Sequence, residues 1–481
     1  MGKAGGRAEV FPRIEPDPLA LEFFRRGAGA GGFSWADLAE ASIWASGGDS
    51  AALQRIHSLA ASIPASPDFP ATERERAEFV LTYLHKNVLK AYSLQQTRVD
   101  TVFSNGRFNC VSSAVLYMVL AKSVGLNVSG VMTKDHAFAT VHIGGENIDV
   151  ETTNGRGFDP GNRKEFHDDF GSVTGFAYVP AQNYRDRQTI TPIELVSLIM
   201  SNRISMAETS RRFAEAVPLA VDRAALLAGI GGSSPVQSAP SVTPFFEDPA
   251  SDLMNRLFNY GAFLLNSGRE EETLRWAALA SSVHPEHERW QEFFMAAINN
   301  RLQRFIRANQ IAQARDFLES HRADLTPANY AQLDAVLFDT ELLSRANAIR
   351  SVEDGDSLAA DVAQARDSGR IDARRASEIL TFAVQKTAAV LSAPPGRNWL
   401  AAIAYLEAAT ARFGANREWE QSLQTFRNNR AADFHNRFAT AWNRRNFDEA
   451  RLILDEGLAE FPNNRQLLSN RETVNRQAHQ D

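Results

Sequence analysis

Apolar residues recur at helical spacing over most of this chain. The first clear helix is expected to begin after Thr72, whose hydroxyl can cap a helix that starts with Glu73 and Glu75. Its apolar positions would share one side: Ala77, Val80, Leu81, Leu84 and Val88. From residue 191 to the end the pattern is almost entirely helical. The main interruption, Gly229 to Pro244, is rich in Gly, Ser and Pro and predicts a linker or a long loop.

Residues 110–190 show a different pattern. The apolar run from Cys110 to about Val124 predicts a helix, and Gly125 follows it where a C-terminal glycine is expected. Three short segments then predict strands, at residues 128–132, 136–143 and 147–152. The pair Gly144-Gly145 indicates a hairpin between the last two. A helix followed by antiparallel strands predicts an α+β domain.

Four segments of the helical part can be aligned without gaps. They are Glu270–Pro285, Ile311–Thr326, Trp399–Gly414 and Phe447–Pro462. Each has a small residue at its fourth position (Thr273, Ala314, Ala402, Ala450) and a bulky residue three places later (Trp276, Phe317, Tyr405, Ile453). The pattern resembles the second helix of tetratricopeptide repeats, although the copies do not keep the period of about 34 residues. The resemblance implies a degenerate, tetratricopeptide-like helical solenoid that binds a protein or peptide partner.

Composition narrows the class of protein. A length of 481 residues suggests roughly two to four domains. A single cysteine excludes an internal disulfide framework and a multi-thiolate zinc site, and no motif indicates a metal or a cofactor, so we expect neither. The net charge of −7 argues against a general nucleic-acid binder, and we expect no nucleic-acid partner.

The chain also lacks an apolar stretch of the ~18 residues that a spanning helix needs, so we expect no transmembrane segment. Its first residues, Met-Gly-Lys-Ala-Gly-Gly-Arg, lack the apolar region of a signal peptide. We therefore expect a soluble protein, either cytoplasmic or, if a leader has been removed, periplasmic. The sequence does not decide between these compartments.

The candidate chemistry centres on Cys110. The N-terminus of a helix favours a thiolate over a thiol, and its free backbone N–H groups can stabilise an oxyanion. His136 opens the second predicted strand, and Asp149 and Glu151 share one face of the third, so that a carboxylate can reach the imidazole. A nucleophile, a base and an orienting carboxylate suffice for cysteine acyl chemistry. The alternatives are a small buried hydrophobic role for Cys110 and a different base, His142, near the hairpin turn.

At these positions the sequence resembles the transglutaminase-like superfamily, whose fold is related to papain. The matching motifs are Gly106-Arg107-Phe108-Asn109-Cys110, His136-Ala137-Phe138 and Glu151-Thr152-Thr153, and the resemblance covers roughly residues 72–190. It implies a nucleophilic Cys110, the base His136 and a third member, Glu151, where the family has Asp. Asp149 is the alternative third member. The side-chain donor of the oxyanion hole would precede Cys110, with Gln95, Gln96 and Asn105 left open.

The predicted organisation has four parts. They are an N-terminal tail and helical extension (1–70), the transglutaminase-like domain (71–190), a helical connector and linker (191–250) and the tetratricopeptide-like region (251–481). We expect a cysteine-dependent enzyme that transfers or hydrolyses an acyl group at amide bonds of a protein or peptide. The alternative is a catalytically inactive interaction scaffold, which the Glu-for-Asp exchange and the long repeat region favour.

Overall fold

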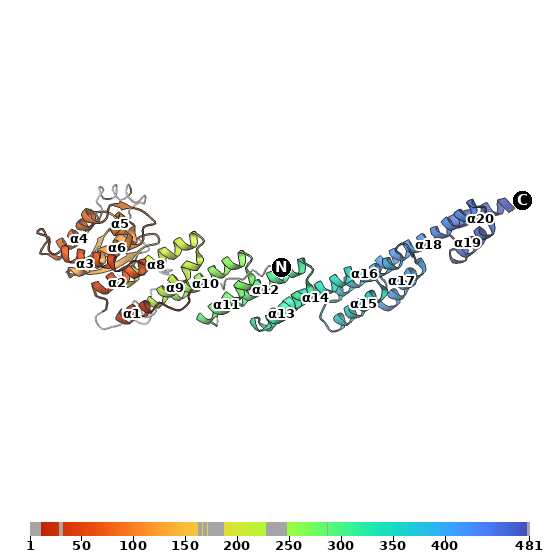
Figure 1. The fold of residues 1–481 in the computed structure, drawn as a ribbon, viewed down its shortest axis with the longest axis horizontal. Helices are drawn as coiled ribbons and strands as arrows, with labels where there is room; N and C mark the ends of the chain where they lie inside the picture. Colours follow the sequence, from red (N-terminus) through yellow and green to blue (C-terminus); the bar gives the residue numbers. More distant parts are fainter. Residues whose placement is uncertain are drawn as a thin grey trace, which may run out of the picture. The chain divides into compact units, whose positions relative to one another are not determined.

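The computed structural model describes residues 11–27, 32–161, 166, 171, 187–227, 248–285 and 287–478. It divides into two compact units, Met1–His287 and Glu288–Asp481. Helix accounts for 71% of the described residues and strand for only 6% (Figure 1). The predicted linker from Gly229 to Pro244 lies outside the described residues.

The first unit surrounds two small sheets with helices. Its helices are α1 (Pro18–Gly27), α2 (Trp35–Ser46), α3 (Ser50–Ser62), α4 (Glu73–Asn87), α5 (Val99–Asn105), α6 (Cys110–Ser123), α8 (Pro192–Thr209), α9 (Phe213–Leu227), α10 (Pro249–Asn266), α11 (Glu270–Ala280) and the 3₁₀ turn η2 (Ser281–Val283). Its strands are β1 (Ala91–Tyr92), β2 (Arg107–Phe108), β3 (Asn127–Met132), β4 (Ala137–Ile143), β5 (Glu146–Val150) and β6 (Gln188–Ile190). Strands β1 and β2 form a parallel pair, and the other four form an antiparallel sheet in the order β5-β4-β3-β6.

Helix α6 is the centre of this unit. Every residue from Cys110 to Ala121 is buried, and the helix is apolar on all sides, as expected of a helix that is covered all round. The hydrophobic cluster around it draws on α1 to α5, the sheet strands and α8. The position of Cys110 is therefore fixed by the most buried element of the unit.

The predicted transglutaminase-like, papain-related α+β fold is wrong. A core of that class needs more sheet than this structure contains: its longest strand, β4, has seven residues, and β6 has three. The predicted helix and hairpin do form, because their apolar patterns are local. Fold class depends on how much sheet the whole unit contains, and here most of the core comes from helices.

The described residues of the second unit contain helices and no strand. The helices are α12 (Arg289–Arg307), α13 (Ile311–Ser320), η3 (Arg322–Asp324), α14 (Pro327–Ala348), α15 (Val352–Asp367), α16 (Ala373–Leu391), α17 (Trp399–Phe413), α18 (Arg417–Asn443), α19 (Phe447–Glu460) and α20 (Arg465–Ala478). Successive helices pack against one another. This helical content is consistent with the predicted helical solenoid.

The four aligned segments begin at the first residues of α11, α13, α17 and α19. Their small fourth residues are all fully buried: Thr273, Ala314, Ala402 and Ala450. Small side chains at these positions let neighbouring helices approach closely, which explains the pattern seen in the sequence. The division between the units falls at His287/Glu288, so α10 and α11 belong to the first unit.

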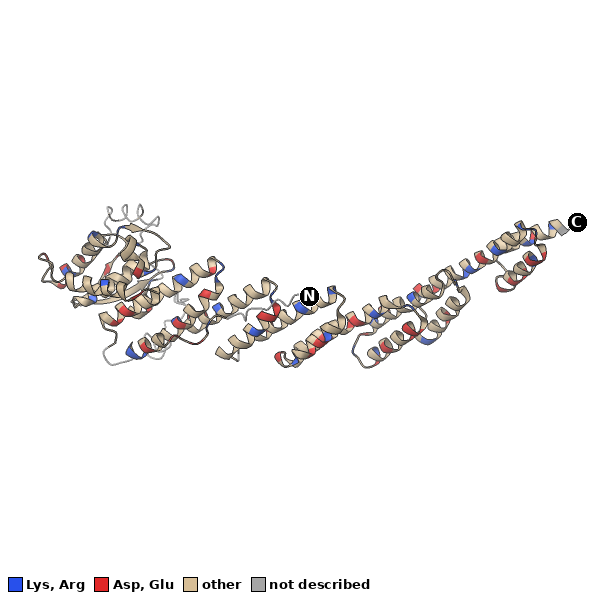
Figure 2. Cartoon of the chain, viewed as in Figure 1, with Lys and Arg blue, Asp and Glu red and all other residues tan. Residues whose placement is uncertain are grey.

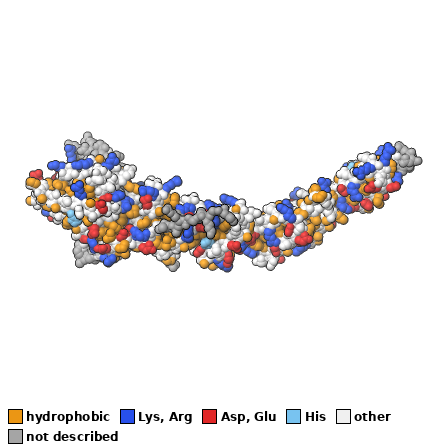
Figure 3. Space-filling model, viewed as in Figure 1, with side chains coloured by type: hydrophobic (Ala, Val, Ile, Leu, Met, Phe, Trp, Pro, Cys, Tyr) orange, Lys and Arg blue, Asp and Glu red, His pale blue; other side chains and the backbone are white. Residues whose placement is uncertain are grey.

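Charged residues of both signs are interspersed along the second unit (Figure 2). On α18, Arg427 pairs with Glu407 at 2.8 Å, and Arg430 pairs with Glu460. Hydrophobic side chains on the visible face are likewise mixed with polar and charged ones (Figure 3). The Arg-rich helix α18 thus carries paired charges rather than a uniformly basic face.

Candidate active site

Cys110 is the first residue of α6, and the turn before it is tightly held. Asn109 caps the helix by accepting the Ser112 N–H at 3.0 Å, and the Ser112 hydroxyl accepts the Asn109 N–H at 2.9 Å. The same two side chains donate to the preceding loop, at the carbonyls of Leu94 (3.0 Å) and Gln96 (2.8 Å). The Cys110 thiol is thus placed at a helix N-terminus, where backbone N–H groups favour an anion.

His136 lies directly before β4 and is bonded to both other members of the predicted set. Its Nε2 donates to Glu151 Oε2 at 2.7 Å, and the ring is also hydrogen-bonded to the side chain of Cys110. A turn fixes the residue, because the Thr133 N–H donates to its carbonyl at 2.9 Å. Cys110, His136 and Glu151 therefore form one connected chain of hydrogen bonds.

The electrostatic surroundings favour a charged His136. Burial by itself lowers the pKa of the imidazole, but the Glu151 carboxylate and the Cys110 side chain together raise the pKa of His136 well above its ordinary value. The ring is therefore a proton donor over a wide pH range. A general acid near a thiol is the arrangement that acyl transfer from an amide requires, because the leaving amine must be protonated.

Glu151 is fixed by its own sequence neighbours. It follows β5 and is 1% exposed. Its Oε1 accepts from both the N–H (3.1 Å) and the hydroxyl (2.7 Å) of Thr153, which leaves Oε2 for His136. A buried carboxylate is costly unless it is paired and hydrogen-bonded, and here three donors satisfy it.

Asp149 has a different role. It lies on β5 and accepts two hydrogen bonds from Arg187, at 2.5 and 2.6 Å, and one from the Thr140 hydroxyl at 2.8 Å. Arg187 also lies over the ring of Phe138, with 5.4 Å between the guanidinium carbon and the ring centroid. Asp149 therefore joins β4, β5 and the segment before β6, and of the two acids Glu151 is the one bonded to His136.

The other candidate residues, His142 and the three possible oxyanion donors, also differ in what their side chains contact. His142 is bonded to Ser129 and Asn147, at the far end of β4 from His136. Gln96 donates to Thr101 and Asn105 accepts the Arg107 N–H, so both side chains are engaged away from Cys110. Gln95 is exposed in the loop that the start of α6 holds. Of the three donor candidates, Gln95 is the one whose side chain has no hydrogen bond within the described residues.

Two residues of the site, His85 and Ser113, were not foreseen from the sequence. His85 of α4 donates from Nε2 to the Thr152 carbonyl at 3.0 Å, and the Ser113 and Thr152 hydroxyls are bonded at 2.9 Å. Burial lowers the pKa of His85, although its bond to Thr152 and the charge of Glu151 act in the other direction. Together they tie the Glu151 turn to α4 and α6. Neither stands out in the sequence, because each lies in an ordinary helical run.

Tyr92 borders the same site. Burial raises the pKa of Tyr92, and the charges of Cys110 and Glu151 raise it further. Its ring meets Phe108 edge-on, with 6.1 Å between centroids, and Phe108 meets His85 in the same manner. Tyr92, Phe108 and His85 therefore form a row of edge-on ring contacts beside the site.

Comparison with known proteins adds no relative: no protein-family model and no curated protein matches the chain. Within the described ranges, no helix combines the length and the apolar character that crossing a membrane demands. Nor does that part of the chain bring together three or more His, Cys, Asp or Glu side chains that could hold a metal ion.

Proposed function

We propose that this chain is a cysteine-dependent enzyme that hydrolyses an amide bond of a protein or peptide or transfers its acyl group. The observation that carries the proposal is the connected chain Cys110–His136–Glu151 at the start of a buried helix. Nucleophile, proton donor and orienting carboxylate are the groups that acyl transfer needs.

In the proposed reaction the Cys110 sulfur attacks the amide carbonyl carbon as a thiolate, paired with protonated His136. The oxyanion that forms is stabilised by backbone N–H groups at the start of α6. The protonated His136 gives its proton to the leaving amine, the C–N bond breaks, and a thioester remains on Cys110. Neutral His136 then takes a proton from the attacking water or amine, the acyl carbon–sulfur bond breaks, and the Cys110 thiolate beside protonated His136 is restored. Glu151 holds the ring in place and stabilises its protonated form.

The reaction can be tested with p-nitrophenyl acetate, which needs no knowledge of the substrate. We expect a burst of nitrophenolate and an acetyl group on Cys110, detected by mass spectrometry of the intact chain. Cys110→Ala should abolish both, and His136→Ala should slow acylation by about a hundredfold, the range of a lost acid–base group. His142→Ala is the matched control, because it removes a second imidazole from the same strand without contacting Cys110.

A contrary result would favour the inactive scaffold. If Cys110 reacts no faster than a free cysteine, and His136→Ala leaves the rate unchanged, the hydrogen-bonded chain is structural.

We further propose that the helical repeats bind a protein or peptide partner, which the aligned segments and their buried small residues support.

A further inference from the structure

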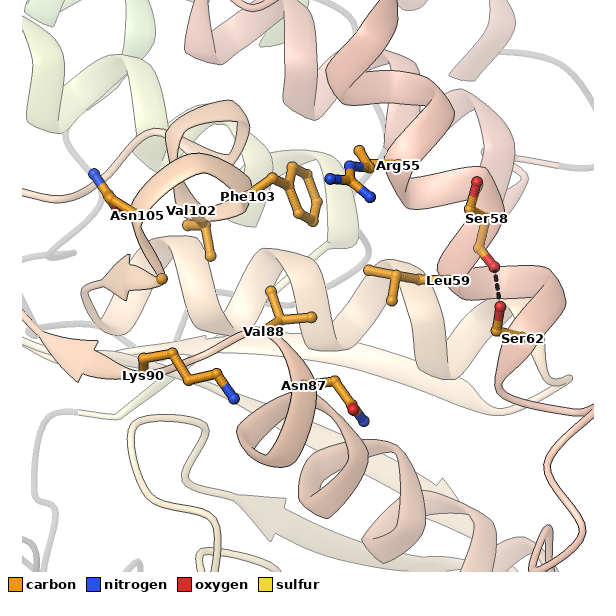
Figure 4. Close-up of a pocket in the computed structure, with 11 residues that line it drawn as sticks. Arg55, Ser58, Leu59, Ser62, Asn87, Val88, Lys90, Val102, Phe103 and Asn105 are labelled. Atoms are coloured by element: carbon orange, nitrogen blue, oxygen red, sulfur yellow. Dashed lines mark hydrogen bonds between the residues drawn. The ribbon is translucent and has the colours of Figure 1, made fainter.

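A hollow lies in the first unit, apart from Cys110, His136 and Glu151. Helix α3, the end of α4 and helix α5 line an open hollow of about 450 Å³ (Figure 4). That volume falls within the range of small-molecule sites, roughly 300–1,000 Å³. None of the three residues of the candidate active site lines it.

The walls of this hollow combine apolar and basic side chains. Leu59, Val88, Val102 and Phe103 converge from α3, α4 and α5, as Figure 4 shows. In that view Arg55 lies on one side of them, and Lys90 lies on the other. These two cations are the only charged side chains among the described residues that line the hollow.

Neither cation is neutralised within the part of the chain that the structure describes. No ion pair there involves Arg55 or Lys90, whereas the nearby Arg98 pairs with Asp100 at 2.6 Å. Lys90 donates one hydrogen bond to the Lys86 carbonyl at the end of α4. Because an ammonium has three N–H donors, two remain for a ligand.

We propose that this hollow binds a small amphipathic carboxylate, a molecule with an apolar body and one anionic end. The apolar side chains would cover the body. Arg55 suits the carboxylate because a guanidinium presents paired donors in the plane of a carboxylate. Lys90, on the other side of the apolar side chains, adds a positive charge to the rim of the hollow. The net charge of the whole chain is −7, so attraction of an anion here is a local property and not a general one. The proposal does not depend on the acyl chemistry at Cys110.

The test is calorimetric titration of the full chain at low salt with three probes that share one apolar body. These are 3-phenylpropionate, 3-phenylpropanol and 3-phenylpropylammonium. We expect the anion to bind, the alcohol to bind at least about tenfold more weakly, and the cation not to bind, because a charged hydrogen bond contributes that much or more. Added salt should weaken binding of the anion alone.

Variants locate the site. Arg55→Met should weaken binding of 3-phenylpropionate by about tenfold, because it removes the partner of the carboxylate and keeps an apolar stem. Lys90→Met should weaken binding less, because its charge lies on the other side of the apolar side chains. Lys86→Met is the matched control: it makes the same charge change one turn away, and its side chain does not line the hollow. Circular dichroism shows whether each variant is folded. If loss of the Lys90 contact unfolds α4, Arg55→Met alone is used to locate the site.

Several outcomes would overturn the proposal. Equal binding of the alcohol and the anion would mean an apolar hollow without anion recognition. Equal effects of Arg55→Met and Lys86→Met would place the binding elsewhere. Inorganic phosphate binding as tightly as the carboxylate would leave the apolar walls without a role. The proposal also fails if 3-phenylpropionate does not bind below about 10 mM.

Discussion

At the scale of single residues, the environment separates two acids that the sequence presents as equals. Asp149 and Glu151 lie two positions apart, yet one is paired with Arg187 and the other with His136. The difference arises because β5 ends at Val150, so that Glu151 begins a turn and Thr153 can bond to its carboxylate. A Glu can thus take the place of a shorter Asp, since the turn and not the strand sets its position.

Glu151→Gln should reduce acylation of Cys110 by roughly tenfold to a hundredfold. The amide keeps the shape of the side chain but removes the negative charge that stabilises protonated His136. The rate is measured with p-nitrophenyl acetate or iodoacetamide. Asp149→Asn is the control, since it removes a charge two residues earlier, on β5, where the carboxylate is bonded to Arg187 and Thr140. Equal losses in the two variants would contradict the assignment of Glu151.

The pKa of His136 gives a second prediction at this scale. Its folded-state pKa is raised, so the protonated ring stabilises the fold fully below its ordinary pKa of about 6.5. That contribution is lost as the pH rises through the higher folded-state value. The melting temperature of the wild type should therefore exceed that of His136→Gln most at about pH 6, and the gap should narrow at alkaline pH. A gap that widens with pH would mean that the ring is buried neutral.

At the scale of elements, the local patterns of the sequence were a good guide. The helix expected from Cys110 to about Val124 is α6, which ends at Ser123, and the predicted hairpin is β4–β5. These follow from short-range periodicity. The convergence of Cys110 and His136 was expected from the same local elements together with the family resemblance.

What the sequence could not provide was the composition of the core. Phe23 of α1, Leu38 of α2 and Ile56 of α3 are fully buried in the same cluster as α6. Their partners are far away in the chain, and periodicity does not identify such contacts. For the same reason the amount of sheet was overestimated, and the contact of His85 with the Thr152 carbonyl was not foreseen.

Close helix packing in the second unit gives an element-scale prediction. Gly355 of α15 is buried, and a Cβ at that position would lie 2.0 Å from Thr387 Oγ1 on α16. Gly355→Ala should therefore destabilise the second unit by about 1–3 kcal/mol, the usual effect of overpacking. Gly396→Ala is the matched control, since a Cβ there would meet nothing within 4 Å. Urea unfolding of both variants measures the difference, and equal stabilities would mean that the two helices separate easily.

At the scale of the whole molecule, α10 and α11 complete the first unit. Arg223 of α9 is buried and bonded to Asp252 of α10 at 2.9 Å, with 4% and 7% of their side chains exposed. Phe11, near the other end of this unit, lies 5.8 Å from the ring of Trp276 on α11. The Trp276 indole N–H in turn donates to the Leu257 carbonyl at 3.0 Å. A chain that stops before α10 would lack all three contacts.

Two truncations should therefore behave differently. A fragment of residues 1–287 should fold and acylate Cys110 within about twofold of the full chain, because a solenoid helix depends mainly on its neighbours. A fragment of residues 1–245 removes Asp252 from buried Arg223, and loss of one partner of a buried ion pair typically costs about 3–5 kcal/mol. It should melt at a lower temperature or aggregate.

The complementary fragment, 288–481, should give a helical circular-dichroism spectrum and retain the protein or peptide partner proposed for the repeats. If 1–245 is as stable as 1–287, the last two helices of the first unit are dispensable. If 1–287 unfolds, the two units share one cooperative core.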